Sequence, residues 1–407
     1  MNPKHIVLLG TLDTKASLFA FLKQEIIRRG CIPILIDVST GGSPPFEGDV
    51  SASEIALLGG KDISEIRASK GREWTKQIMQ EGARKKIELL NSDGLLDGIM
   101  AIGGWYMLAF ASEVMRVLPF GIPKLIICSG VRRDVYEIFD HMDVAIMQAL
   151  VDLADLNEFT QDVLTRGADA ICSMAKKPSF TLPRGKAIAL TEMGICEKCS
   201  QMVKTQLIQE GFRVYPFHSQ GIGDAIMESL ISQGYFDGVI DIAPAGVIEE
   251  LFERPRRAGP RRLEAAGERG LPQVLAPCCI NITSASPYGK NYEKYASRSR
   301  QLKEDNFRIA TRYNVEELIE AAKVYAEKLN KAKGPVKFLI PLRGWSSWEW
   351  EGSVLYAPEE DRAFVEELKR NLKPSIQVIE VDCNINDPEF ANTLVENFKE
   401  VYNIVKS

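Results

Sequence analysis

The stretch His5-Ile-Val-Leu-Leu-Gly10-Thr11 decides the fold, because the chain repeats its pattern as Lys186-Ala-Ile-Ala-Leu-Thr191. A second pair of related stretches follows, Asp97-Gly-Ile-Met-Ala-Ile102 in the first copy and Asp237-Gly-Val-Ile-Asp-Ile242 in the second. Segments with helical spacing lie between these apolar runs, so each copy predicts strand, helix, strand, helix, strand. This order is typical of an open parallel sheet with helices on both faces. We therefore expect an α/β protein made of two tandem Rossmann-like domains.

The length and one irregular segment set the predicted domain limits. A chain of 407 residues exceeds what one hydrophobic core usually supports. Residues 176–185 contain two prolines, a glycine and several basic residues, which disfavour regular structure. We expect a first domain over residues 1–178, a second over residues 184–407 with a C-terminal extension, and a cleft between them. Residues 144–174 are apolar enough to predict a buried helix, either at a domain or subunit interface or in the core of the first domain.

The composition favours a soluble cytoplasmic protein. With 45% hydrophobic and 26% charged residues, the chain can form two cores. The formal net charge of -5 argues against nonspecific binding to nucleic acid or to anionic membranes. The sequence has no run of about twenty apolar residues and leads straight into a strand, so we expect neither a membrane span nor a signal peptide. The eight cysteines indicate reduced thiols, metal ligands or catalytic groups before disulfides.

The turn after the first strand, Gly10-Thr11-Leu12-Asp13-Thr14-Lys15, is a candidate phosphate site. Backbone N–H groups at the start of a helix attract anions, and Thr11, Thr14 and Lys15 would add two hydroxyls and a cation. The turn lacks the Gly-x4-Gly-Lys-Ser/Thr spacing of a Walker A motif. An ordinary turn between a strand and a helix would look the same, so both interpretations stay open.

Several stretches along the whole chain resemble one protein family. They are residues 10–15, 44–47, 217–223, 258–266, 341–344 and 382–388. In these the chain is similar to the largely uncharacterised family typified by the ATP-binding N-terminal region of the tomato mosaic virus resistance protein. The resemblance implies two Rossmann-like domains, a homodimer, and ATP with Mg²⁺ as a ligand near Gly103 and Gly104. Trp105 and Tyr106 stand where the family has small residues, which predicts weak ATP binding or none at this loop.

The second domain carries cysteines at predicted strand ends. Cys196 and Cys199 form a C-x-x-C at the start of a helix, and Cys278 and Cys279 follow a later strand. Because the carboxyl ends of parallel strands open at one edge, Cys196, Cys199 and Cys278 would converge there as ligands for zinc or an iron–sulfur cluster. A helix N-terminus lowers the pKa of a thiol, so Cys196 is alternatively a reactive thiolate. Buried structural cysteines are the third interpretation.

His218, Cys196 and Arg343 are the candidate catalytic residues. His218 ends a predicted strand before a glycine-rich turn, which favours an acid–base role, although a capping histidine is the plain alternative. Gly221 and Gly223 in that turn would offer backbone amides to an anion. Arg343 ends another strand beside two tryptophans and suits a carboxylate or another anion. Two functions stay open: an enzyme acting on a small anionic metabolite in the cleft, or a regulatory protein that binds ATP or a metabolite without turnover.

Overall fold

The computed structural model describes residues 3–132, 135–139, 142–177, 182–183, 185–287 and 289–406. The chain divides into two compact units, Met1–Thr181 and Leu182–Ser407, which we describe one at a time. Each unit contains a parallel sheet of the Rossmann-like kind, so the predicted α/β fold with two tandem domains is confirmed. Among the described residues, no helix is both long and apolar enough to cross a bilayer.

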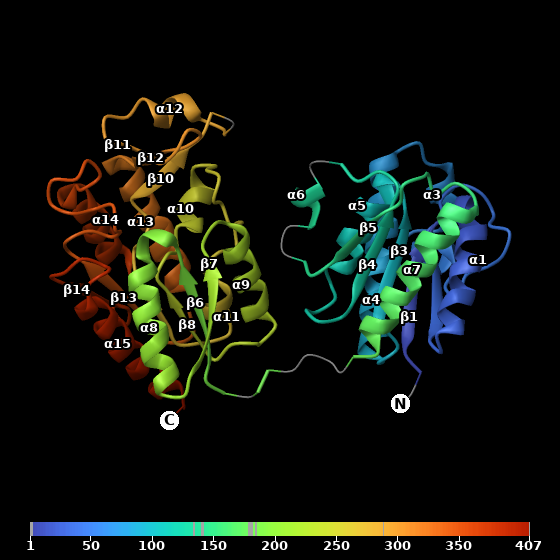
Figure 1. The fold of residues 1–407 in the computed structure, drawn as a ribbon, viewed down its shortest axis with the longest axis horizontal. Helices are drawn as coiled ribbons and strands as arrows, with labels where there is room; N and C mark the ends of the chain where they lie inside the picture. Colours follow the sequence, from blue (N-terminus) through green and yellow to red (C-terminus); the bar gives the residue numbers. More distant parts are fainter. Residues whose placement is uncertain are drawn as a thin grey trace. The chain divides into compact units, whose positions relative to one another are not determined.

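Unit 1 is a five-stranded parallel sheet with helices on both faces (Figure 1). Its strands stand in the order β2-β1-β3-β4-β5, so the direction of winding reverses between β1 and β3. In chain order the elements are β1 (His5–Gly10), α1 (Leu12–Arg28), β2 (Ile32–Asp37), α2 (Ala52–Leu58), α3 (Ile63–Ala68), α4 (Arg72–Ser92), β3 (Gly98–Gly103), α5 (Trp105–Met115), β4 (Lys124–Cys128), α6 (Val135–Phe139), β5 (Ala145–Gln148) and α7 (Glu158–Ala175).

Side-chain alternation explains how this sheet is packed on its two faces. Val7 and Leu9 of β1 belong to the core that includes α2, α4 and α5. Ile6 and Leu8 of the same strand belong to the core that includes α1 and α7. Successive side chains of a strand point to opposite faces, so a strand covered on both sides must be apolar throughout. The apolar run His5–Gly10 therefore forms β1, a strand inside the sheet between β2 and β3.

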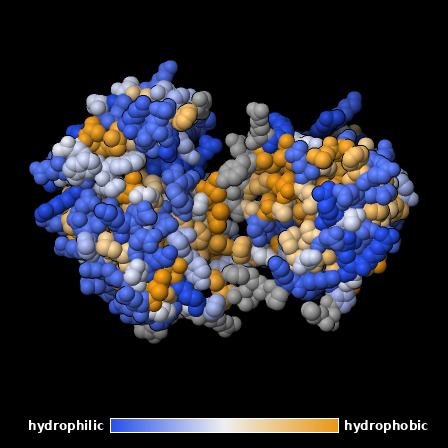
Figure 2. Space-filling model, viewed as in Figure 1, coloured by the Kyte–Doolittle hydropathy of each residue, from blue (hydrophilic) through white to orange (hydrophobic). Residues whose placement is uncertain are grey.

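The prediction of one buried helix over residues 144–174 is wrong. Ala145–Gln148 form β5, the edge strand of the sheet, and α7 begins only at Glu158. The intervening loop exposes apolar surface, and Leu150 is 91% exposed. Figure 2 shows hydrophobic residues on part of the visible surface of each unit. The apolar composition of this segment thus reflects an edge strand and a loop, as well as a helix with one buried face.

Unit 2 is a six-stranded parallel sheet in the order β14-β13-β9-β8-β6-β7 (Figure 1). In chain order its elements are β6 (Ala187–Glu192), η1 (Gly194–Cys196), α8 (Glu197–Gln209), β7 (Arg213–His218), α9 (Ile222–Ser232), β8 (Gly238–Asp241), α10 (Gly246–Leu251), α11 (Ala265–Glu268), β9 (Gln273–Leu275), β10 (Ile282–Ala285), α12 (Tyr292–Ala296), β11 (Gln301–Lys303), β12 (Ile309–Arg312), α13 (Val315–Asn330), β13 (Val336–Pro341), α14 (Pro358–Asn371), β14 (Gln377–Val381) and α15 (Pro388–Lys406). The predicted C-terminal extension supplies β13 and β14, which continue the same sheet.

A small antiparallel sheet interrupts the repeat in unit 2. Its strands, in the order β10-β12-β11, come between β9 and α13 in the chain. The pairing of β10 with β12 sets Ile282 opposite Arg312. Asn281, directly before β10, and Arg312, the last residue of β12, are therefore held close together. Both belong to the candidate site of unit 2.

Candidate functional site

The predicted phosphate turn of unit 1 is largely occupied by its own side chains. Gly10 is needed for packing, because a Cβ atom there would lie 2.0 Å from the ring of Phe19. The hydroxyls of Thr11 and Thr14 lie 2.9 Å apart, and Lys15 donates through Nζ to the carbonyl of Leu153. Two N–H groups at the start of α1 already have acceptors, since those of residues 12 and 13 donate to the side chains of residues 37 and 39. This arrangement leaves fewer donors for a phosphate than the sequence suggested.

The Gly103-Gly104 loop of unit 1 is more open. Helix α5 follows it with Gly104 as the N-cap and no side-chain cap. A Cβ atom on Gly104 would meet nothing within 4 Å beyond its chain neighbours, whereas one on Gly103 would lie 2.6 Å from Met107 Cβ. Trp105 packs against the core of unit 1, and Tyr106 is 53% exposed. Weak ATP binding, or none, at this loop stays a prediction.

His218 and Arg343, two of the candidate catalytic residues, lie far apart in unit 2. His218 is exposed at the end of β7, the edge strand, and Arg343 follows β13. Three strands separate β7 from β13, which puts them about 19 Å apart at the usual spacing between strands. Arg343 is exposed and pairs with Asp382 through two hydrogen bonds of 2.8 and 2.6 Å. The structure does not bring these two side chains together at one small ligand.

The glycine turn after β7 also has a structural explanation. Gly221 has a positive φ of 89°, and its N–H donates to Asp224 Oδ2 at 2.9 Å. A Cβ atom on Gly223 would lie 2.0 Å from the carbonyl oxygen of His218. The turn thus needs glycine for its conformation, and the amide of Gly221 is already bonded within the chain.

The cysteines of unit 2 do converge, as buried thiols. Cys278 Sγ lies 4.0 Å from Cys279 Sγ, which in turn is 3.1 Å from the sulfur of Met193. Burial, together with hydrogen bonding to Cys196, raises the pKa of the Cys278 thiol, and burial raises that of Cys199. Among the described residues, no group of three or more His, Cys, Asp or Glu side chains is arranged to hold a metal ion. The geometry therefore gives the zinc or iron–sulfur prediction for Cys196, Cys199 and Cys278 no support.

A buried charge cluster surrounds Arg262 near the ends of β6 and β8. Arg262 pairs with Asp224 at 3.0 Å, Glu228 at 3.1 Å and Asp241 at 2.7 Å. Asp241 also accepts a hydrogen bond of 2.7 Å from the hydroxyl of Thr191. The carboxylate oxygens of this cluster have hydrogen-bond donors except Asp241 Oδ2, which forms an ion pair with Arg262 but no hydrogen bond. These paired charges tie the elements that carry them together in the fold.

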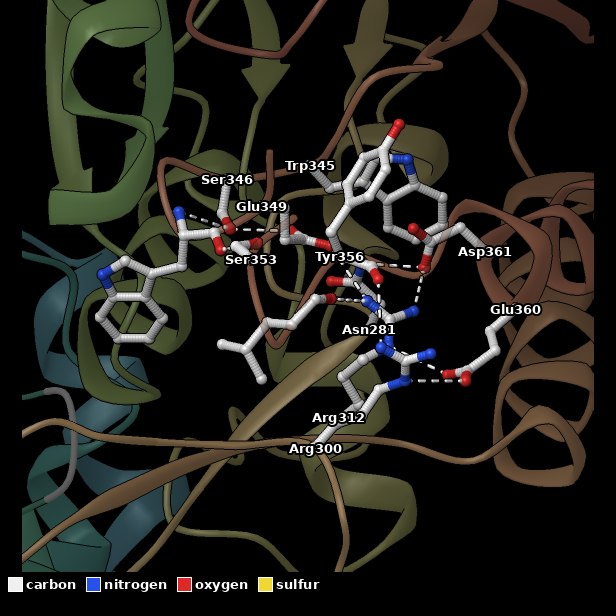
Figure 3. Close-up of polar contacts among 12 residues, drawn as sticks. Asn281, Arg300, Arg312, Trp345, Ser346, Glu349, Ser353, Tyr356, Glu360 and Asp361 are labelled. Atoms are coloured by element: carbon white, nitrogen blue, oxygen red, sulfur yellow. Dashed lines mark hydrogen bonds and ion pairs between the residues drawn. The ribbon is translucent and has the colours of Figure 1, made fainter. Parts of the chain in front are cut away.

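A second buried cluster in unit 2 has a different character. It joins Glu349 and Asp361 to Arg312 and Asn281, and Figure 3 shows these side chains converging. Glu349 comes from the loop after β13, Asp361 from the first turns of α14, Arg312 from β12, and Asn281 from the segment before β10. All four residues are buried. We call this set the acid cluster.

One carboxylate oxygen of the acid cluster has no bonding partner among the described residues. The amide of Asn281 donates to Glu349 Oε1 at 2.6 Å and to Asp361 Oδ1 at 2.9 Å. Arg312 donates to Glu349 Oε1 at 3.0 Å and pairs with Asp361 Oδ1. The Ser346 hydroxyl donates to Glu349 Oε2 at 2.7 Å. Both oxygens of Glu349 thus have partners, whereas contacts within the described part of the chain reach only Oδ1 of Asp361.

The electrostatics of the acid cluster favour a retained proton. Burial and the nearby charge of Asp361 raise the pKa of Glu349 from 4.5 to about 8, although Arg312 opposes the rise. Burial also raises the pKa of Asp361, against the opposing effects of Arg312 and Asn281. Because the two carboxyl groups share the same partners, they titrate as a pair. Near neutral pH the pair therefore keeps a proton, because the pKa of Glu349 lies at about 8.

Two cavities border the acid cluster. The first has a volume of about 330 Å³, is lined by Asp361 and by other residues of α14 and β13, and is called the α14 cavity here. The second has a volume of about 420 Å³, is lined by Arg298, Arg300 and Arg312, and is called the arginine cavity. Glu360 also lines the arginine cavity and accepts a hydrogen bond of 3.0 Å from Arg312 Nε. The buried carboxyl pair therefore borders ligand-sized space directly through Asp361 and indirectly through Arg312.

Sequence reasoning missed the acid cluster, although two signals were available. The stretch Trp345-Ser-Ser-Trp-Glu349 follows a strand end, where ligand-binding residues gather in α/β sheets. The stretch Pro358-Glu-Glu-Asp361 opens a helix, where carboxylates are ordinarily explained by the helix dipole. Nothing in their spacing indicates that Glu349 and Asp361 meet.

Comparison with known proteins identifies one family along the whole chain. The models for the N-terminal and C-terminal domains of the uncharacterised protein family UPF0261 match residues 4–179 and 185–402. A UPF0261 protein of Clostridium tetani is 34% identical over 96% of this chain and 97% of its own length, and one of Brucella melitensis is 30% identical over 98% and 95%. The ToMV resistance protein Tm-1(GCR237) of Solanum lycopersicum is 26% identical over 98% of this chain and 56% of its own length. The chain belongs to the UPF0261 family.

Proposed function

We propose that this protein is an enzyme that transfers protons to and from a small anionic metabolite bound in the α14 cavity. One observation carries the proposal: Asp361 lines the cavity, only one of its oxygens is bonded among the described residues, and it is paired with the proton-holding Glu349. Perturbed carboxyl pairs of this kind are common at active sites, where one member acts as a base while the other holds a proton.

Each member of the acid cluster has a distinct role in this proposal. Asp361 accepts a proton from the substrate through Oδ2, because Oδ1 is held by Arg312 and Asn281. Glu349, which does not line the cavity, keeps its own proton, and the proton taken up by Asp361 returns to the substrate from the same oxygen. Arg312 balances the charge of Asp361, and the Ser346 hydroxyl fixes the orientation of Glu349. A buried, pre-oriented pair of this kind needs little rearrangement during proton transfer.

The lining of the α14 cavity combines apolar and charged side chains, since Arg362 and Lys369 line it together with Glu366 and Glu380. Leu342, Trp345 and Val365 supply apolar contacts beside Asp361. Lys369 is bonded to Glu380 at 2.5 Å, whereas Arg362 makes a long, exposed contact of 3.8 Å with a glutamate. Arg362 is therefore the basic group most available to an anionic substituent, and a guanidinium suits a carboxylate or phosphate.

Hydrogen exchange tests the proposal whatever reaction follows proton removal. Small carboxylic acids and phosphate esters are incubated with the protein in D₂O, and ¹H NMR follows the loss of C–H signals next to carbonyl groups. Thermal unfolding measured with the same compounds identifies those that bind. We expect exchange of a bound compound to disappear in Asp361→Asn and Glu349→Gln.

Asp382→Asn is the matched control, because it removes an exposed carboxylate that pairs with Arg343 away from the cavity. This variant should exchange the compound as the natural chain does. A compound that exchanges equally in all three variants, or a panel in which none binds or exchanges, would count against the proposal.

A further inference from the structure

The arginine cavity gathers three cationic side chains from separate segments of unit 2, and Glu316 and Glu360 also line it. Arg298 follows α12, Arg300 directly precedes β11, and Arg312 ends β12. We propose that this cavity binds an oxyanion, either a free ion or the phosphate or carboxylate group of a metabolite, and that the bound anion regulates the acid cluster through Arg312. The proposal has two halves. The binding half, that an oxyanion binds in the cavity, does not depend on the proposed function. The regulatory half, that the bound anion acts on the acid cluster, rests on that function.

The present partners of the three arginines show where an anion would bind. Arg298 is engaged by Glu317 through two hydrogen bonds of 2.8 and 2.7 Å. Arg300 has weaker contacts, because it lies 3.3 Å from Glu360 and donates to two carbonyl groups at 3.3 Å. Arg300 is therefore the guanidinium that an incoming oxyanion would engage first, through the paired donors that match its geometry.

Glu360 currently occupies the position that we assign to the anion. Its two oxygens face Arg300 at 3.3 Å and Arg312 at 3.0 Å, so it bridges them (Figure 3). The side chain of Glu360 is partly exposed and lies in the first turn of α14, where rotation into solvent breaks no buried contact other than that with Arg312 among the described residues. An oxyanion in the cavity would replace it on both guanidinium groups.

Arg312 connects the anion to the carboxyl pair. Its remaining N–H groups contact Glu349, Asp361 and the carbonyl of Leu355. Asn281 and Ser346, which also face the pair, are neutral, whereas the charge of Glu360 acts on Asp361. Replacing the single charge of Glu360 by a dianion adds negative charge beside Arg312 and so favours the protonated form of the pair. Coupling between two sites is reciprocal, so the anion should bind more tightly when the pair is protonated.

Calorimetric titration of the full chain with sulfate tests the binding half, since sulfate keeps its charge across neutral pH. We expect Arg300→Gln to weaken sulfate binding by at least about tenfold, because hydrogen bonds between two charged groups are lost. Arg308→Gln is the matched control: it lies in the adjoining hairpin and pairs with Asp305 and Glu304 outside the cavity. Equal sulfate affinity in Arg300→Gln and the natural chain would overturn the site.

Two further arms identify the source of the oxyanion and test its coupling. Titration with inorganic phosphate and with glycerol phosphate separates a free ion from a metabolite group, and tighter binding of the ester supports the metabolite.

Titration with sulfate at about pH 6.5 and about pH 9 should show about fivefold tighter binding at the lower pH, and this difference should vanish in Glu349→Gln. Sulfate binding that needs Arg300 but is independent of pH would overturn regulation alone. Proton exchange that survives without any sulfate binding would overturn this inference and leave the proposed function intact.

Discussion

Substitution of Glu349 by glutamine gives the most informative test of the acid cluster. A glutamine resembles the protonated glutamic acid: its oxygen accepts from Asn281 and Arg312, and its amide donates to the Ser346 hydroxyl, which turns from donor to acceptor. The ordinary pKa of a glutamate side chain, 4.5, rises to about 8 for Glu349 in the folded chain. Between these values the folded chain binds one proton more than the unfolded chain. This proton contributes stability that is fully present below 4.5 and is lost as the pH rises through about 8.

The magnitude follows from linkage. One proton changes the free energy of unfolding by about 1.4 kcal/mol per pH unit, which gives a loss of about 2 kcal/mol between about pH 6 and about pH 8. Glu349→Gln should lack this loss, so its stability relative to the natural chain should rise by that amount over the same range. Groups outside the acid cluster titrate equally in both proteins and cancel in the difference.

Urea denaturation of the full chain, followed by tryptophan fluorescence, provides the assay because three of the five tryptophans belong to unit 2. Asp382→Asn serves as the control, since its carboxylate is exposed and paired with Arg343 at the surface. Its difference from the natural chain should stay constant between the two pH values. Parallel pH dependences for Glu349→Gln and the natural chain would refute the assigned proton.

Three further expectations concern other parts of the chain. Arg312→Met should destabilise unit 2 by about 3–5 kcal/mol in the same denaturation assay, because it leaves buried carboxylates without their cation; an unchanged midpoint would show that the cluster is hydrated. Gly10→Ala should lower the free energy of unfolding by about 1–3 kcal/mol, because its Cβ would lie 2.0 Å from the ring of Phe19. Gly104→Ala faces open space and should be nearly neutral. Equal effects of the two substitutions would contradict the packing described. Calorimetric titration with ATP and Mg²⁺ should give weak binding or none, and micromolar affinity that is lost in Gly103→Trp would show that the steric argument from the sequence is wrong.

The fold was accessible from the sequence because both domains show it in local patterns. The apolar runs at residues 5–10 and 187–191 are continuous since each strand is covered on both faces. The small antiparallel sheet was not predicted, because β11 has only three residues and β10 and β12 have four each. Runs of this length carry little periodic signal. The helix predicted over residues 144–174 was wrong for a related reason, since apolar content alone does not separate an edge strand from a buried helix.

The candidate site was much less accessible. His218, Cys196 and Arg343 were chosen because each follows a predicted strand, but the sequence does not fix which strands are neighbours in a sheet. The acid cluster draws single residues from four separate segments, and its contacts span 37 to 80 positions along the chain. Its chemistry also depends on burial, which turns ordinary carboxylates into a coupled pair. Neither spacing nor composition indicates such a change.

¹³C NMR of the side-chain carboxyl groups measures the protonation of Glu349 without relying on stability or activity. Protein labelled at the glutamate δ-carbon is titrated with pH, and the Glu349 signal is assigned by its absence in Glu349→Gln. We predict a carboxyl signal that titrates near the pKa of about 8, far above that of exposed glutamates. A Glu349 signal that titrates in the ordinary range near 4.5 would show that Glu349 is ionised at neutral pH and holds no proton.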